Sequence, residues 1–131
     1  MTNIVEELSN IEDIFYVGGC SDSQLKEAQE LLGCTFPDDY IRYVEEFGCI
    51  SFDAVEWTGL NIEGRLNVVT ATETERELDP NFPEKYFVLE NLGIDGKMIL
   101  LNEEGYVYLF QQGTTKLVAD SLLDYLSLII E

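Results

Sequence analysis

Thiols and carboxylates are the side chains in this sequence whose chemistry would suit a catalytic or metal-binding site. The three cysteines, Cys20, Cys34 and Cys49, lie 14 and 15 positions apart, and the sequence contains neither a CxxC pair nor a histidine. This spacing matches no common zinc pattern, and the odd number of cysteines argues against a disulfide framework. The cysteines therefore predict free, buried thiols in a reducing compartment.

Catalysis is poorly supported by these residues. Cys20 follows two glycines and precedes an expected helix, whose N-terminus would lower its pKa, but no histidine or base lies beside it. Histidine, the usual general base near neutral pH, is absent, and no two of the 26 Asp and Glu residues stand out as a catalytic pair. Walker, dinucleotide-binding and calcium-loop spacings are also missing. We expect no catalytic residue, metal or cofactor, and an enzyme that uses two carboxylates is the least favoured hypothesis.

The charge balance is the unusual feature of the composition. The 131 residues include 26 acids and 7 bases, a formal net charge of −19, and both halves of the chain share the excess. Repulsion among so many negative charges opposes compaction of the chain. The same negative charge disfavours nucleic acid and anionic membranes as partners. A basic protein partner is the functional interpretation of the charge, and solubility is the alternative.

The pattern of the first half predicts helices. Thr2 would cap a first helix, and Ser21 with Gln24 forms a capping box for a second helix that Gly33 ends. Pro37 suits the first position of a third helix, which Gly48 ends.

From residue 49 the pattern changes to strands. We expect a half-buried strand over 49–57 and one or two strands over 59–72. A short helical turn over 72–78, capped by Thr72, should follow. A strand over 85–91, a hairpin over 96–110, a short strand over 116–119 and a final helix over 122–130, capped by Ser121, complete the expected order.

This order predicts a single α+β domain over residues 1–131, with a mixed, largely antiparallel sheet and helices packed mainly on one side. The first ten residues lack the basic and apolar regions of a signal peptide, and no stretch approaches the about 20 apolar residues of a membrane span. We therefore expect a cytoplasmic protein.

A binding surface is the remaining functional prediction. Residues 38–63 hold seven acids and one base, with the single tryptophan among them. The helix dipole disfavours two of these acids, which lie in the last turn of the third helix. An apolar anchor among acids suits a basic target, although for the tryptophan taken alone a core or sheet-face position is the favoured interpretation. The candidate partner-binding residues are Glu45, Glu46, Asp53, Glu56, Trp57 and Glu63.

The stretch EAQELLGCTFPDDYIRYVEEFGCISFDAVEWTGLNI, residues 27–62, resembles the signature of the SUKH superfamily, named for a yeast cell-wall synthesis regulator. The matching elements are Leu32-Gly33, Phe36-Pro37, Asp39-Tyr40, Phe47-Gly48 and Gly59-Leu60. The segments VVTATETERE, YFVLENLGIDGKMILLNEEGYVYLF and ADSLLDYL resemble later parts of the family pattern. Many members carry Asn-Gly where this chain has Phe47-Gly48.

The resemblance implies an α+β fold and a bacterial immunity protein that binds and blocks a polymorphic toxin. Such toxins are often nucleases, which are basic, so the acidic composition fits a cognate toxin domain as the partner. The alternative is a regulatory scaffold or peptide-binding module, in which an apolar groove rather than charge would set the affinity. The family provides no shared catalytic residue that transfers to this chain.

Overall fold

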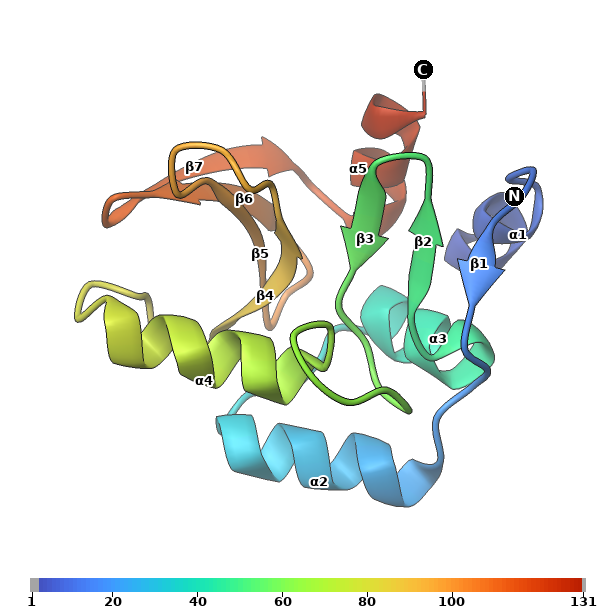
Figure 1. Ribbon diagram of the computed structural model, residues 1–131, viewed down its shortest axis with the longest axis horizontal. Helices are drawn as coiled ribbons and strands as arrows, with labels where there is room; N and C mark the ends of the chain where they lie inside the picture. Colours follow the sequence, from blue (N-terminus) through green and yellow to red (C-terminus); the bar gives the residue numbers. More distant parts are fainter. Residues whose placement is uncertain (1–2, 131) are drawn as a thin grey trace.

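A computed structural model describes residues 3–130 (Figure 1). Within these residues, five helices and seven short strands form an α+β fold, so the predicted fold class is confirmed. The helices are α1 (Ile4–Ser9), α2 (Asp22–Leu32), α3 (Asp38–Phe47), α4 (Val68–Leu78) and α5 (Leu122–Ile129). The strands are β1 (Phe15–Tyr16), β2 (Ile50–Phe52), β3 (Val55–Trp57), β4 (Tyr86–Asn91), β5 (Met98–Asn102), β6 (Val107–Gln111) and β7 (Thr114–Ala119).

The strands form two antiparallel sheets rather than one mixed sheet. The smaller sheet has the order β1-β2-β3, and the larger one has the order β4-β5-β6-β7. Thr58, directly after β3, connects them, because its N–H donates to the Leu89 carbonyl and its hydroxyl to the Val88 carbonyl, both at 2.7 Å. The β4–β5 register shifts at this point, between Val88 and Glu90, where β4 bonds to both neighbours.

The helix boundaries follow the local signals closely. Ser21 and Gln24 form the predicted capping box, and Gly33 ends α2 in the left-handed conformation. Ser121 caps α5 by accepting a hydrogen bond from the Asp124 N–H at 3.0 Å. Pro37 is the N-cap of α3 and not its first residue. The predicted cap Thr2 lies outside the described residues, and Asn3 caps α1.

Two predictions for the middle of the chain are wrong. Residues 49–57 form a hairpin rather than one strand, because Asp53 adopts a positive φ of 50° and reverses the chain. Residues 59–72 contain no named strand: a loop leads into α4, whose N-cap Asn67 accepts from the Val69 and Thr70 N–H groups. Thr72 therefore lies inside α4, where its buried hydroxyl accepts a hydrogen bond from the Val88 N–H.

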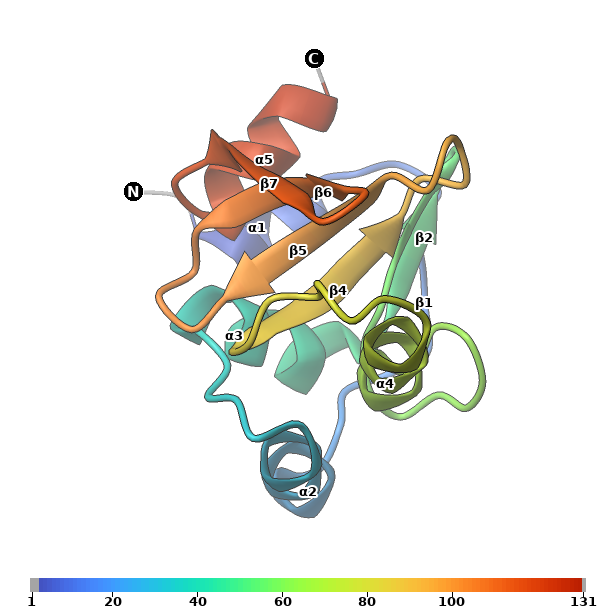
Figure 2. The same cartoon turned by 90° about the vertical axis from the view of Figure 1, so that its left-hand side faces the viewer.

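The hydrophobic core has a large and a small part. The large part lies between the smaller sheet, the helices α1, α3 and α5, and one face of the larger sheet, behind which α1 and α3 are visible in Figure 2. The small part covers the opposite face, with Phe82, Val88, Met98, Leu100 and Phe110. Alternate residues of β4 and β5 thus point into different clusters, which explains why β5 is buried along its whole length and β4 along its four central residues.

Two glycines allow the segments around the smaller sheet to pack backbone to backbone. A Cβ atom on Gly59 would overlap the Gly48 carbonyl oxygen, and one on Gly48 would overlap the Gly18 carbonyl oxygen. The Leu60 N–H donates to the same Gly48 carbonyl at 2.8 Å. This junction fixes the end of α3 against the segment that follows β1. None of the helices formed by residues 3–130 is long and apolar enough to cross a membrane.

Candidate functional site

The edge strand β1 exposes two adjacent aromatic side chains. Phe15 is 64% and Tyr16 is 55% exposed, although both belong to a strand. Tyr16 contacts the core only at its margin, where its ring lies edge-on to Phe47 at a centroid distance of 5.6 Å. Large aromatic groups are costly to leave in water, and an uncovered strand edge is open to association. This edge is therefore the first candidate for a binding surface.

The strand register places acids beside these aromatics. Phe15 pairs with Ser51, and Ser51 pairs with Glu56 on β3, so these three residues form one row on the outer face of the smaller sheet. Asp13 precedes β1 and Asp53 follows β2. Because the two strands are antiparallel, these acids belong to the same end of the sheet.

The last turn of α3 lies beside the other end of β1. The Gly18 N–H donates to the Phe47 carbonyl and the Cys20 N–H to the Val44 carbonyl, both at 2.9 Å, so the segment after β1 caps the end of α3. Glu45 and Glu46 are exposed in this turn. The structure thus brings four of the predicted residues around β1. We define the β1 face as the surface around this strand edge, from which Phe15 and Tyr16 project on opposite sides of the strand; it comprises Asp13, Phe15, Tyr16, Glu45, Glu46, Asp53 and Glu56.

Glu63 belongs to another part of the surface. It lies in the loop between β3 and α4, and the β2–β3 turn lies at the opposite end of the hairpin (Figure 1). This loop approaches α2, where the Gln24 side-chain amide donates to the Asn61 Oδ1 at 3.5 Å. Glu63 and Gln24 line the same shallow hollow. The structure therefore does not unite Glu63 with the β1 face.

Trp57 is a core residue, and the prediction that it contacts a partner directly is wrong. Its side chain has no exposed area, because it pairs with the inward-facing Ile50. The ring packs edge-on against Tyr43 at 5.5 Å and stacks with Tyr125 at 6.3 Å. The alternative considered for Trp57 on sequence grounds, a core position, is the one that the structure shows.

A buried polar cluster lies next to Trp57. The Tyr125 hydroxyl donates a 2.9 Å hydrogen bond to Glu90 Oε1, and both residues are buried. Burial raises the pKa of Glu90, while the hydrogen bond from Tyr125 lowers it. The buried indole N–H of Trp57 also lowers the pKa of Glu90, although it meets the geometry of a hydrogen bond with no acceptor among the described residues. This cluster faces the core and is separate from the β1 face.

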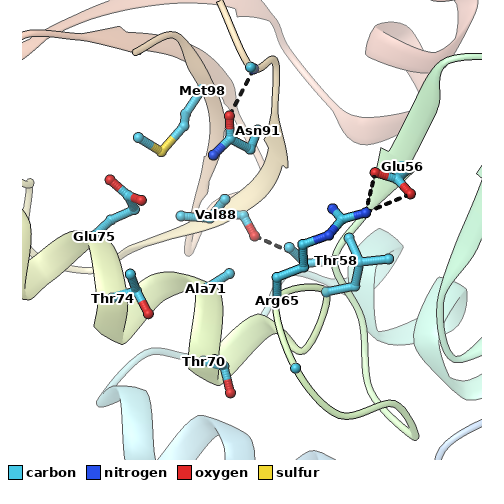
Figure 3. A pocket seen from close by; sticks show the side chains of 13 residues that line it. Glu56, Thr58, Arg65, Thr70, Ala71, Thr74, Glu75, Val88, Asn91 and Met98 are labelled. Atoms are coloured by element: carbon cyan, nitrogen blue, oxygen red, sulfur yellow. Dashed lines mark hydrogen bonds and ion pairs between the residues drawn. The ribbon is translucent and has the colours of Figure 1, made fainter.

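A cavity of about 600 Å³ lies between β3, α4 and the larger sheet (Figure 3). Arg65 and Glu56 form a 3.0 Å ion pair on one wall of this cavity. α4 forms another wall, with Ala71 and Glu75 one helical turn apart. Val88 of β4 and Met98 of β5 contribute apolar surface. Since Glu56 belongs to both features, the cavity and the β1 face form one continuous surface.

The thiols of the described residues are poorly suited to nucleophilic chemistry. Burial raises the pKa of Cys20 and Cys34, and it raises the pKa of Cys49 to about 11. The thiolate, which is the nucleophilic form, is therefore disfavoured at neutral pH. Within residues 3–130, no three His, Cys, Asp or Glu side chains are grouped to hold a metal ion.

Comparison with known protein families agrees with this structure. The model of the SUKH_5 family, described as SMI1-KNR4 cell-wall, matches residues 1–131, which is the whole chain. The chain belongs to the SUKH superfamily. This superfamily includes toxin-immunity proteins and is generally non-catalytic, so a protein partner is the general expectation for a SUKH domain. A search of curated proteins found no match.

Phe15 and Tyr16 are residues of the candidate site that the sequence did not predict. The sequence signal that could have indicated their exposure is that the two aromatic residues are adjacent. Successive side chains of a strand point to opposite faces, so two neighbouring aromatics cannot both enter one core. They stand between the acids Glu12 and Asp13 and a Gly-Gly pair, in a segment too short to show a period.

Proposed function

We propose that this SUKH domain is a bacterial immunity protein that binds a basic, nuclease-like toxin domain and blocks it by direct occlusion. In this proposal the β1 face is the contact surface, with Phe15 and Tyr16 as apolar anchors inside a rim of carboxylates. The protein acts without catalysis, in the cytoplasm, where its cysteines remain reduced.

The observation that supports this proposal is the scarcity of internal charge compensation. Within residues 3–130 there is one ion pair shorter than 4.0 Å, between Arg65 and Glu56. The chain carries a net charge of −19, so the uncompensated carboxylates generate a strong negative field. Such a field accelerates association with a basic protein and repels nucleic acid.

The nuclease-like character of the partner follows from the same chemistry. A nuclease holds phosphates with Lys and Arg side chains, and a surface of carboxylates competes for those side chains. Fast association also suits an inhibitor that must bind a toxin before the toxin acts.

The experiment that tests this proposal is co-expression of the chain with the toxin encoded beside its gene. Survival of the cells and recovery of a one-to-one complex are the expected results. Growth arrest together with no complex would reject the proposal.

A regulatory scaffold or peptide-binding module is the second candidate, and the cavity beside α4 favours it. Salt distinguishes the two candidates, because exposed charge pairs are screened over about 8–10 Å at ordinary ionic strength. Binding that survives high salt would support a peptide module, whereas binding that collapses supports the immunity protein. Trp57→Ala does not separate them, since Trp57 is buried in the core.

A further inference from the structure

The cavity beside α4 contains a carboxylate that lacks a cationic partner. On one wall, Glu56 and Arg65 neutralise each other through their 3.0 Å ion pair. Glu75 projects from α4 on the opposite side (Figure 3). Its side chain is partly buried, and no described Lys or Arg lies within 4.0 Å of it. Burial and the nearby charge of Asp79 both raise the pKa of Glu75.

The remaining lining can hold a long side chain that is apolar along its stem. Ala71, Val88 and Met98 form the apolar part of the cavity. Thr70 and Thr74, which are one turn apart on α4, also line the cavity and add hydroxyl groups to its wall. A carboxylate and hydroxyl acceptors beside an apolar surface match a side chain with methylene groups and a cationic end.

We propose that this cavity receives an arginine side chain of the basic partner, with the guanidinium bound to Glu75 and the stem packed against Val88 and Met98. The inference rests on the proposed function and extends it to a specific contact. Arginine fits better than lysine, because its planar group donates five hydrogen bonds and is more weakly hydrated. The volume of about 600 Å³ exceeds one side chain, so neighbouring partner residues enter with it.

Methyl NMR of the full chain tests this assignment with the peptide acetyl-Gly-Arg-Gly-amide as the probe. The expected result is a saturable shift of the methyl signals of Ala71, Val88 and Met98. The corresponding Gln peptide should leave these signals unchanged, and the Lys peptide should bind more weakly. Equal saturation by the Lys and Arg peptides would overturn the assignment to arginine, and unresponsive cavity methyls would overturn the site.

Matched variants on α4 separate the contribution of the cavity to peptide binding from that of the overall negative charge. Glu75→Gln should weaken binding of the Arg peptide about fivefold or more, because a charge-assisted hydrogen bond is lost. Glu77→Gln removes the same charge from an exposed position on the same helix and should leave the affinity unchanged. An equal effect of the two substitutions would overturn the proposal.

The same variants distinguish this inference from the proposed function. If both variants still protect cells from the toxin and the peptide produces no shift in the cavity, the inference fails and the immunity function stands. If the peptide saturates the cavity but the unaltered chain neither protects cells nor binds the toxin, the immunity function fails. In that case the cavity remains a site for arginine-containing segments.

Discussion

Replacement of Phe15 by alanine should weaken partner binding more than it weakens the fold. A phenylalanine side chain offers about 200 Å² of surface. Phe15 is 64% exposed, which leaves about 130 Å² for a partner to cover. At about 25 cal/mol per Å², full coverage would contribute about 3 kcal/mol. Because interfaces do not convert all of their area into affinity, we expect a loss of about 2 kcal/mol, or about 30-fold in Kd.

The cost to the fold should be smaller, because only the covered third of the side chain contributes to it. That third corresponds to about 70 Å², or at the upper bound about 1.8 kcal/mol. Urea unfolding measures this cost, and isothermal titration calorimetry against the toxin domain measures the affinity. Tyr106→Ala is the matched control, since Tyr106 is another aromatic residue, 41% exposed, outside the β1 face. Unchanged affinity of Phe15→Ala, or an equal loss in Tyr106→Ala, would refute the role of β1 as the anchor.

Two further predictions concern the fold behind the site. Gly59→Ala should lower the free energy of unfolding by about 3 kcal/mol or more, because the added methyl group meets the rigid Gly48 backbone; a thermal melt checks this. Glu90 has a raised pKa in the folded state, so its contribution to stability is present below its ordinary value of 4.5 and is lost as the pH rises through the raised value. In Glu90→Gln the fall in unfolding free energy from pH 4.5 to neutral pH should therefore be smaller than in the unaltered protein. Glu104→Gln, at an exposed position, should retain the full fall; an equal fall in both variants would contradict this account of Glu90.

Local signals explain why part of the fold was predictable. The capping box of Ser21 and Gln24 acts within a single turn, so it sets the start of α2 without help from the rest of the chain. Gly33 ends α2 for an equally local reason, because it adopts the left-handed conformation of a C-terminal cap. The repeated apolar runs of β5 and β6 predicted their hairpin, with Gly105 at a positive φ.

Other features depend on contacts between distant residues, which the local pattern does not contain. The β-branched run that opens α4 favours a strand by propensity. Tertiary contacts override this preference, because Val68 and Thr72 are buried and the Thr72 hydroxyl meets the Val88 N–H. The turn at Asp53 was missed for a different reason. A non-glycine residue at positive φ is uncommon, so alternation on both sides of Asp53 favoured one continuous strand.

The candidate site was predictable in charge but not in position. Glu45 and Glu46 were predicted because the dipole of α3 disfavours negative charge in the last turn of the helix. The sequence does not show that they lie near Asp53 and Glu56, because that proximity depends on the pairing of β1 with β2. Trp57 was included among the contact residues because the acids surround it in the sequence, whereas the hairpin register turns it inward opposite Ile50.

The central claim is that the partner meets the acids of the β1 face and not the negative charge of the whole molecule. Two variants that change the net charge equally test it. One neutralises Asp13, Glu45, Glu46 and Asp53 as Asn, Gln, Gln and Asn, and the other neutralises the exposed Glu27, Glu30, Glu73 and Glu77 as Gln.

The decisive measurement is the Kd of each variant for the toxin domain at one ionic strength, by isothermal titration calorimetry. We predict a loss of at least about 30-fold for the first variant, from about 0.5 kcal/mol for each neutralised charge, and less than about threefold for the second. Equal losses in the two variants would contradict the claim.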